Sequence, residues 1–479
     1  MGVKMRNGWG GSAGAPTISR LQPTCQDDLG FPRSPSTASE ASCTTTMLLA
    51  VALAAPVGWW YRRRAQMLPL PPALKAAGVV IHPSLRQQFQ GAAGNGLTTV
   101  SAVDSGTVLL RVPRAAVLSG SMAQSILGCQ DVDPEVALLA LLAEARRAAE
   151  KGQDLLGLKD YLLALPADFP SLPLTFTEEE AFVQLRGSVL VVATTAQASA
   201  LADEQQEAMT KFSQLNAVWS SERMQWAKAA LLTRAGPCLV APSEEAAPSV
   251  GMVPLVDFAN CSDDPSAACR LGEGDAIELV ATRPLKAGDA VTISYGQQSQ
   301  EQQLFNFGFT LDSAPLDMLT PLAMIPPPSS TASELRGVLL QLLFMERSEQ
   351  ADAIAGALPP VAVLRARSPE DFDLSELRAV ANLLEMPEDE LRAVADHVKE
   401  KQKLPAALRS SASAAALQKL VALMGTWHEE LTAPAPAERR FQAAAAYRRR
   451  AAELVAAALR RLKAEEEVAA ATSGAPLAL

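Results

Sequence analysis

The chain has 479 residues, which is enough for two or three domains and a sizeable core. Its net charge of −10 argues against a nucleic-acid-binding protein, because such proteins present a basic face to the phosphates, and fits a protein partner better. Aromatic residues make up 5% of the chain and alanine is abundant, which favours helices outside the central segment.

The cysteines and histidines do not form a recognisable metal site. The chain has six cysteines and three histidines, and no Cys-x-x-Cys pair occurs. A tetrahedral zinc site needs clustered thiolates or imidazoles, so we expect no metal. We expect reduced, mostly buried thiols of an intracellular compartment, where disulfides are rare. The cysteines are Cys25, Cys43, Cys129, Cys238, Cys261 and Cys269.

The first 65 residues differ in composition from the rest. Residues 1–46 are rich in Ser, Thr, Gly, Ala and Pro with few acids, which is typical of a plastid transit peptide. The apolar run 47–60 is shorter than the roughly 20 residues that cross a bilayer. It is the core of a targeting signal, a weak signal-anchor or part of an unstructured leader. We expect a targeting or disordered leader over 1–65, chloroplast localisation and no firm membrane span, with a cytoplasmic or weakly membrane-anchored protein as the alternative.

Short apolar runs at 79–81, 94–100 and 108–113 follow the leader. The second run begins with Gly94 and Gly96, a pair that lets the backbone pass close to a ligand or take a tight turn. It is not a dinucleotide-binding fingerprint, because the third glycine and the following helix are missing. Taken alone, the pair is explained by a plain turn.

A helical block comes next. Residues 134–151 have the pattern of an amphipathic helix, with Pro134 in the first turn and basic residues late. A loop with three prolines spans 162–175, and Thr177 before three glutamates predicts a second helix start with a threonine N-cap. Helical stretches continue to about residue 233. Taken alone, Arg234 is a charge near a helix C-terminus.

The central segment, 250–309, has a different character. An apolar run at 252–256 predicts a strand and leads into the polar step Asp257-Phe258-Ala259-Asn260. Strands are predicted at 276–281 and 290–295, joined by a turn at 285–289, and Gly296 ends the second. The segment closes on Phe-Gly-Phe at 307–309. A buried aspartate and asparagine need partners. By pattern alone, a capped strand end or an Asx-turn explains them.

The composition changes again after residue 309, where prolines at 315, 321 and 326–328 mark a boundary. The segments that follow are rich in Ala and Leu and have polar faces, as an all-α bundle requires. The last predicted helix carries seven arginines, which form either a solvated face or a surface for an acidic partner. The predicted helices are 334–347, 374–385, 388–400, 404–424 and 437–471.

The order of these pieces resembles the SET domains of the plant Rubisco large-subunit lysine methyltransferase class. That class carries a P-x-x-D-x-x-N-H step, and this chain has Pro254, Asp257, Asn260 and then Cys261. An I-x-x-G-(D/E)-x-(V/I)-x-I-x-Y-G strand matches 285–296, and a Y-G-F element matches 307–309. The N-terminal G-x-G-L motif matches 94–97, and W-A-x-x-x-V-x-S-R matches 226–234.

The resemblance implies an α+β fold with a SET-type small-strand core. The core would span 74–314, with a helical insert at about 122–235, and an all-α domain over 331–471 would bind the protein substrate. The implied activity is transfer of a methyl group from S-adenosyl-L-methionine to a lysine of a protein not identified by the sequence. Such an in-line transfer needs alignment and a neutral amine more than covalent chemistry.

The resemblance also assigns site residues. Arg234 would clamp the cofactor carboxylate, a role suited to a guanidinium fork, and Asn260 would hold the amino-acid end. Tyr295 and Asp257 would be catalytic. The implied substrate channel contains Thr233, Tyr295 and Phe307. The implied cofactor-binding residues are Gly94, Asn95, Gly96, Arg234, Asp257, Asn260 and Cys261.

Two positions depart from the class. Cys261 replaces its histidine, and Phe307 replaces its usual catalytic tyrosine, which removes one hydroxyl from the site. Loss of a single well-placed donor costs about 10²–10³ in rate. Three hypotheses therefore stay open: a lysine methyltransferase that relies on Tyr295, a methyltransferase with another acceptor such as histidine, and a catalytically silent binding protein that keeps the fold.

Overall fold

The structure is a computed structural model and describes residues 65–212, 220–235, 251–319, 331–345, 363–401 and 403–471. The predicted leader, including the apolar run 47–60, lies outside the described residues except for residue 65. No helix among the described segments is long and apolar enough to cross a membrane.

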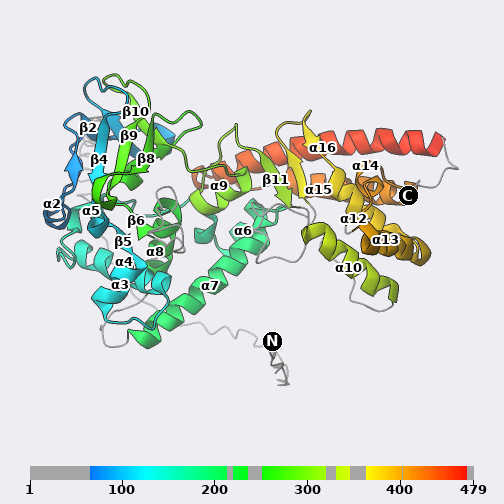
Figure 1. The fold of residues 1–479 in the computed structure, drawn as a ribbon, viewed down its shortest axis with the longest axis horizontal. Coiled ribbons are helices and arrows are strands. Elements are labelled where there is room, and N and C mark those ends of the chain that lie inside the picture. Colours follow the sequence, from blue (N-terminus) through cyan, green and yellow to red (C-terminus); the bar gives the residue numbers. More distant parts are fainter. Residues whose placement is uncertain are drawn as a thin grey trace, which may run out of the picture. The chain divides into compact units, whose positions relative to one another are not determined.

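Two four-stranded sheets form the core of the N-terminal half. The first has the order β1-β4-β9-β8 and is antiparallel throughout. The second has the order β2-β3-β10-β7, in which β10 pairs antiparallel with β3 and parallel with β7. In Figure 1 the blue strands from the first part of the chain stand beside the green strands from its middle. The strands are β1 Val80–Ile81, β2 Leu85–Phe89, β3 Asn95–Thr99, β4 Val108–Val112, β7 Asn260–Cys261, β8 Ala267–Leu271, β9 Ile277–Ala281 and β10 Ala290–Ile293.

Burial explains which strands the sequence revealed. Strands β4 and β9 lie at the centre of their sheet, and β9 is buried at every position, so both read as apolar runs. We assigned no strand to β2 or β8, which are half-buried or exposed at most positions and carry polar residues between apolar ones. Both lie at sheet edges, where fewer side chains must be apolar.

The apolar run 252–256 is not the strand that we predicted. Strand β6 covers only Gly251–Met252 and pairs with β5 Leu118–Ser119. The chain then turns, with Leu255 at a φ of 73°, into a 3-10 helix at Val256–Phe258. Pro254 has no N–H to donate to a ladder, and the positive φ of Leu255 is incompatible with an extended strand. The turn places the side chain of Asp257 in the interior, where it is 1% exposed.

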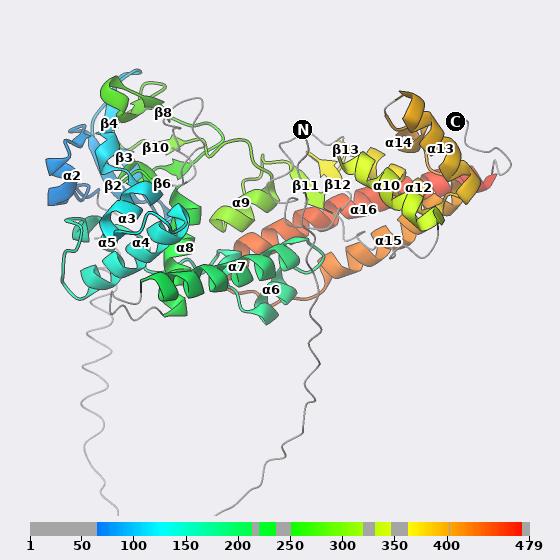
Figure 2. The same cartoon turned by 60° about the horizontal axis from the view of Figure 1, so that its bottom comes forward.

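In its described residues, the helical block between the two sets of strands contains six α-helices: α3 Gly120–Leu127, α4 Pro134–Glu150, α5 Lys159–Ala164, α6 Glu178–Gln184, α7 Leu190–Lys211 and α8 Ser221–Arg234. Helix α4 begins at Pro134 as predicted, and Asp133 caps its N-terminus. The predicted threonine cap of α6 is present as a full capping box between Thr177 and Glu180. In Figure 2, α7 extends from the region of α4 and α8 to α6.

The C-terminal region is helical and also contains a small sheet that we did not predict. Strand β11 Leu316–Leu319 pairs with β12 Val363–Ala366, which pairs with β13 Phe372–Asp373. The predicted helix 404–424 is two helices, because the polar segment 411–413 separates them and Ser413 caps the second. The helices are α10 Thr331–Met345, α12 Ser375–Glu385, α13 Glu388–Lys401, α14 Ala407–Ser410, α15 Ala414–Thr432 and α16 Gln442–Ala471.

Helix α9 (Gln300–Phe307) joins the two halves of the described chain. We assigned no helix to it, although Ser299 and Gln302 form a capping box. Leu304 of α9 and Leu185, the residue that follows α6, belong to the same buried apolar cluster as Trp427 and Tyr447 of the C-terminal helices. The phenol of Tyr447 also donates to the hydroxyl of Ser188 at 3.2 Å. The helical insert and the C-terminal helices therefore share one core.

Candidate active site

A cavity of about 480 Å3 opens beside β3, within the size range of about 300–1,000 Å3 that is usual for small-molecule sites. Its walls come from four separate parts of the chain: β2 with the turn before β3, the loop after α5, the end of α8, and the segment before β7. The lining residues that matter below are Gly94, Asn95, Arg234, Phe258 and Asn260. We call this the polar cavity.

The turn before β3 exposes backbone to the polar cavity. Gly94 has a φ of 73° and a ψ of −145°, a combination that is essentially confined to glycine. A Cβ added there would meet no atom within 4 Å, so the backbone of Gly94 faces open space. The exposed Asn95 follows it. The turn leaves room for a ligand close to the main chain.

Gly96 is needed for a different reason. A Cβ at this position would overlap the side-chain amides of Gln90 and Asn260. Those two amides are hydrogen-bonded to each other, since Asn260 Nδ2 donates to Gln90 Oε1 at 2.7 Å. Gln90 Nε2 in turn donates to the carbonyl of Leu97 at 2.8 Å. Gly96 thus lets the two amides lie against β3, and they tie β7 to the turn before β3.

Arg234, the last residue of α8, reaches the same cavity. Its Nη1 donates to the backbone carbonyl of Asp257 at 2.8 Å and lies 3.5 Å from Asp257 Oδ2. Its guanidinium lies 5.8 Å from the centre of the Phe258 ring. Among the described residues, Arg234 Nε is a buried polar atom without a hydrogen-bond partner. Arg234 is therefore anchored to Asp257 through Nη1, while its buried Nε remains a donor without a partner.

The carboxyl of Asp257 is held from a second direction. Tyr161 of α5 donates its phenolic proton to Asp257 Oδ2 at 3.0 Å. Burial raises the pKa of Asp257 from 3.8 to about 6, against the opposing influence of Arg234 and of the hydrogen bonds from Tyr161 and the backbone. Burial also raises the pKa of Tyr161 well above its ordinary value, so this phenol stays protonated as the donor. Asp257 is itself held in place by these contacts, and it therefore fixes the position of Arg234.

Three aromatic rings pack together next to this network. The centre of the Tyr295 ring lies 4.9 Å from that of Phe307 and 6.2 Å from that of Phe309. The hydroxyl of Tyr295 donates to the carbonyl of Ala259 at 2.9 Å. Tyr295, Asp257 and Arg234 line one enclosed cavity of about 10 Å3, close to the room that a single water needs. Burial raises the pKa of Tyr295 above its ordinary value, so it is not a proton acceptor near neutral pH.

Thr233 and Cys261 make contacts that differ from those expected for their predicted roles. The hydroxyl of Thr233 donates to the carbonyl of Ala229 in its own helix, at 2.8 Å. Cys261 lines a separate groove of about 830 Å3 rather than the polar cavity. That groove runs past residues 294 and 296, on either side of Tyr295, and its other wall is formed by β12 and β13. Both assignments stay predictions.

Two residues of this site were missed by our sequence analysis. Gln90 precedes the Gly94 turn in a polar stretch with no distinguishing pattern. Tyr161 lies 96 residues before its partner Asp257, and the one available signal was its rarity, since the chain has four tyrosines. Neither pairing is visible without the fold.

The state of the cysteines differs in part from our expectation. Cys129 and Cys261 are free thiols, but Cys269 is disulfide-bonded, so the prediction of reduced thiols is wrong for that residue. Cys269 is half-buried on the edge strand β8, where the core does not enclose it. Among the residues that the structure describes, no group of three His, Cys, Asp or Glu side chains is placed to hold a metal ion.

The sequence matches no family model and no curated protein. Solved structures do match the fold. The SET domain of LSMT bound to lysine and AdoHcy is 16% identical, with a TM-score of 0.56 over 83% of this chain and 90% of that one. The chain has a SET-type fold. Rubisco LSMT bound to AdoMet is also 16% identical, with a TM-score of 0.57 over 83% of this chain and 92% of that one.

This likeness confirms the predicted fold class and the resemblance in architecture to Rubisco LSMT. The alignment covers 83% of this chain, which is more than the SET-type core or the C-terminal helical region alone would account for. A third structure, the SET domain of LSMT bound to MeLysine and AdoHcy, gives a TM-score of 0.59 at 15% identity, covering 83% of this chain and 93% of that one. At this level of identity the likeness concerns the fold alone.

Proposed function

We propose that this SET-fold protein is an S-adenosyl-L-methionine-dependent protein-lysine N-methyltransferase. The observation that carries the proposal is the convergence of Gly94, Arg234 and Asn260 on one cavity. These residues are up to 166 positions apart, yet a network of hydrogen bonds through Gln90, Asp257 and Tyr161 holds the site together. Solved proteins of similar fold hold AdoMet, AdoHcy and lysine.

The donors around the polar cavity fit the amino-acid end of that cofactor. Arg234 has a buried Nε without a partner, which suits a carboxylate, because guanidinium–carboxylate hydrogen bonds are charge-assisted. Asn260 presents an amide already fixed by Gln90, and the Gly94 backbone faces open space. Asp257, Gly96 and Cys261 do not line the polar cavity, so they would support the residues that contact the cofactor and would not contact it themselves. When bound, the cofactor supplies an activated methyl group on a sulfonium.

Tyr295 would orient the acceptor amine. Its hydroxyl proton is committed to Ala259, so its oxygen offers lone pairs that accept an N–H of the incoming amine. This contact would turn the nitrogen lone pair toward the methyl group. The raised pKa of Tyr295 means that the amine does not lose its proton to this residue. The ring of Phe307 supports Tyr295 without a second hydroxyl.

The groove beside Tyr295 would admit the polypeptide that carries the lysine. It is lined by Cys261, by the glutamines at 297 and 298, and by Arg367 and Asp371 from the C-terminal region. This lining offers hydrogen-bonding groups of both kinds along an open path. Contacts from β12 and β13 fit a role of the C-terminal region in holding the substrate.

Two measurements test the proposal. Calorimetric titration of S-adenosyl-L-methionine into the full chain should give micromolar binding that Asn260→Ala abolishes. Protein extract incubated with the enzyme and methyl-labelled cofactor should then yield labelled methyl-lysine after acid hydrolysis. Label in histidine would show a changed acceptor. Absence of binding at millimolar cofactor would overturn the proposal and leave the catalytically silent binding protein.

A further inference from the structure

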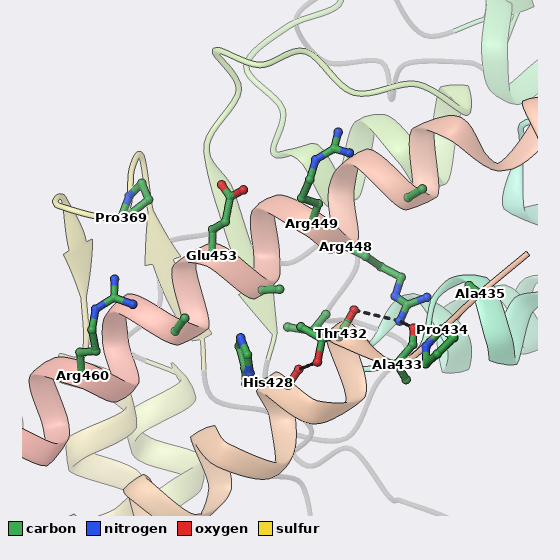
Figure 3. A pocket seen from close by; sticks show the side chains of 14 residues that line it. Pro369, His428, Thr432, Ala433, Pro434, Ala435, Arg448, Arg449, Glu453 and Arg460 are labelled. Atoms are coloured by element: carbon green, nitrogen blue, oxygen red, sulfur yellow. Dashed lines mark hydrogen bonds between the residues drawn. The ribbon is translucent and has the colours of Figure 1, made fainter. Parts of the chain in front are cut away.

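A second large cavity, of about 840 Å3, lies between α15 and α16 in the C-terminal helical region. Figure 3 shows the side chains of Arg449, Glu453 and Arg460 extending from α16, and those of His428 and Thr432 from α15. Pro369, in the turn between β12 and β13, borders it as well. We call this cavity the arginine groove. It shares no lining residue with the polar cavity or with the groove beside Tyr295.

The arginine groove has a small-residue floor between two basic ends. Ala452 and Ala456 lie between them on one face of α16, about one turn apart, and Ala445 continues that face on the other side of Arg449. Arg449 and Arg460 are 11 residues apart on that face, three turns of helix, which separates them by about 16 Å at 1.5 Å per residue. A floor of alanines lets a polypeptide backbone approach the helix between the two guanidinium groups.

The arginines of the groove differ from their neighbours on α16 in lacking partners. Arg450 pairs with Asp312 at 3.2 Å, and Arg461 pairs with Glu465 at 3.4 Å. Arg448 also borders the groove, but it is buried and donates to backbone carbonyls of residues 183, 430, 431 and 433. In the described part of the chain, Arg449 and Arg460 have neither an ion pair nor a hydrogen bond from their side chains.

Arg449 and Arg460 remain unpaired within the described residues although the chain has more acidic than basic residues. The chain has 52 aspartates and glutamates against 42 lysines and arginines, so internal carboxylates are plentiful. Glu453 lies four residues after Arg449 on the same helix, within the spacing of a helical ion pair, and still does not pair with it. Two exposed guanidinium groups at opposite ends of one groove are therefore available to carboxylates from outside.

We propose that the arginine groove binds an acidic segment of a partner polypeptide. An extended chain advances about 3.3 Å per residue, and its side chains return to the same side every second residue. Carboxylates four or six positions apart, roughly 13–20 Å, span the two arginines, with small residues between them over the alanine floor. Glu453 disfavours a further carboxylate near the middle of the segment and disfavours a continuous polyanion such as nucleic acid. The proposal does not depend on methyl transfer.

Fluorescence anisotropy with the full chain tests this directly. The probe is a fluorescein-labelled peptide of about seven residues, with glutamates four positions apart and alanine or serine elsewhere; its control carries glutamine in their place. The acidic peptide should bind saturably and the control weakly. R449Q with R460Q should weaken binding about tenfold, because two exposed charge pairs are lost together.

Matched variants separate the groove from overall charge. R439Q with K463Q removes the same net charge from exposed residues outside the groove lining and should leave the affinity within twofold. Ala456→Phe fills the floor while keeping every charge and should weaken binding as well. The proposal is overturned if both double variants weaken binding equally, or if the glutamine peptide binds as well. It is also overturned if an oligonucleotide displaces the labelled peptide at a lower concentration than the unlabelled acidic peptide does. The same holds if sedimentation shows that the wild-type chain is a dimer and that R449Q with R460Q makes it monomeric.

Discussion

The polar cavity and the aromatic cluster of Tyr295, Phe307 and Phe309 lie side by side and are built in opposite ways. The polar cavity depends on side chains tied to partners far along the chain, as Asn260 is to Gln90 and Arg234 is to Asp257. The aromatic cluster depends on ring packing and contains one hydroxyl, that of Tyr295. The proposed cofactor binding and the proposed methyl transfer are therefore expected to respond to different substitutions.

The largest expected effect tests the aromatic cluster. Tyr295→Phe removes the hydroxyl oxygen that would align the amine, and kcat should fall about 10²–10³-fold. The affinity for S-adenosyl-L-methionine should stay within a few-fold, because Tyr295 does not line the polar cavity. Steady-state kinetics and calorimetry on the same preparation give both values. A variant that keeps its kcat would mean that the amine is aligned by another group.

The second effect tests the polar cavity. Arg234→Gln leaves the buried carboxyl of Asp257 without its cation, and breaking a buried pair in this way costs about 3–5 kcal/mol. Because Asp257 can take up a proton instead, we expect the free energy of unfolding to fall by the low end of this range, about 3 kcal/mol, in urea unfolding at pH 7.

Adding Asp257→Asn to that variant provides the control. Asparagine carries no charge, so the double variant should recover part of the lost stability. Calorimetry should show that neither variant binds cofactor at the wild-type affinity. Equal destabilisation of the single and double variants would mean that the guanidinium acts through packing alone.

The same contrast explains how far the sequence led to the fold. Strands β9 and β10 and the capping box of α6 were predicted because their signals are local: a buried apolar run, or a threonine three residues before a glutamate. The edge strands β2 and β8 gave no such signal. The apolar run 252–256 misled us, because burial by a turn and burial by a strand leave the same composition.

The site shows a similar division. Gly94, Arg234 and Asn260 were assigned from short motifs and do meet at one cavity. Tyr161 and Gln90 were missed, because each acts on a partner that only the fold brings near. Thr233 had a motif but its hydroxyl is used within its own helix. Motifs therefore located the residues that face the cavity, together with Asp257, but not Gln90 and Tyr161, which hold Asn260 and Asp257 in place.

The third effect is a pH dependence from Asp257. Its pKa is about 6 in the folded protein and 3.8 unperturbed, so between about pH 4 and 6 the folded state binds the proton more tightly than the unfolded state. Stability from this group therefore falls as the pH rises through that window, by about 2–3 kcal/mol in total. Asp257→Asn cannot ionise, so its stability relative to wild type should rise by that amount from pH 4 to pH 7 in urea titrations. A constant difference would contradict the raised pKa.

The smallest expected effect tests the hydrogen bond between Tyr161 of the helical insert and Asp257, which contacts Arg234. Tyr161→Phe keeps the buried ring and removes the hydrogen bond to Asp257 Oδ2, which should cost about 1–2 kcal/mol in urea unfolding. That hydrogen bond favours the ionised carboxyl, so its loss should move the midpoint of the Asp257 step above pH 6.

A shift of this midpoint separates positioning from packing. A void left by the hydroxyl would lower stability equally at every pH, whereas loss of a partner for the carboxylate lowers it only where Asp257 is ionised. Leu162→Ala in the same helix supplies the packing control, since its side chain belongs to the apolar core. If both variants lower stability uniformly across pH, Tyr161 only fills space. If Tyr161→Phe alone shifts the step and weakens cofactor binding a few-fold, α5 sets the position of Arg234 through Asp257, and the cofactor end is held by the insert as well as by the sheets.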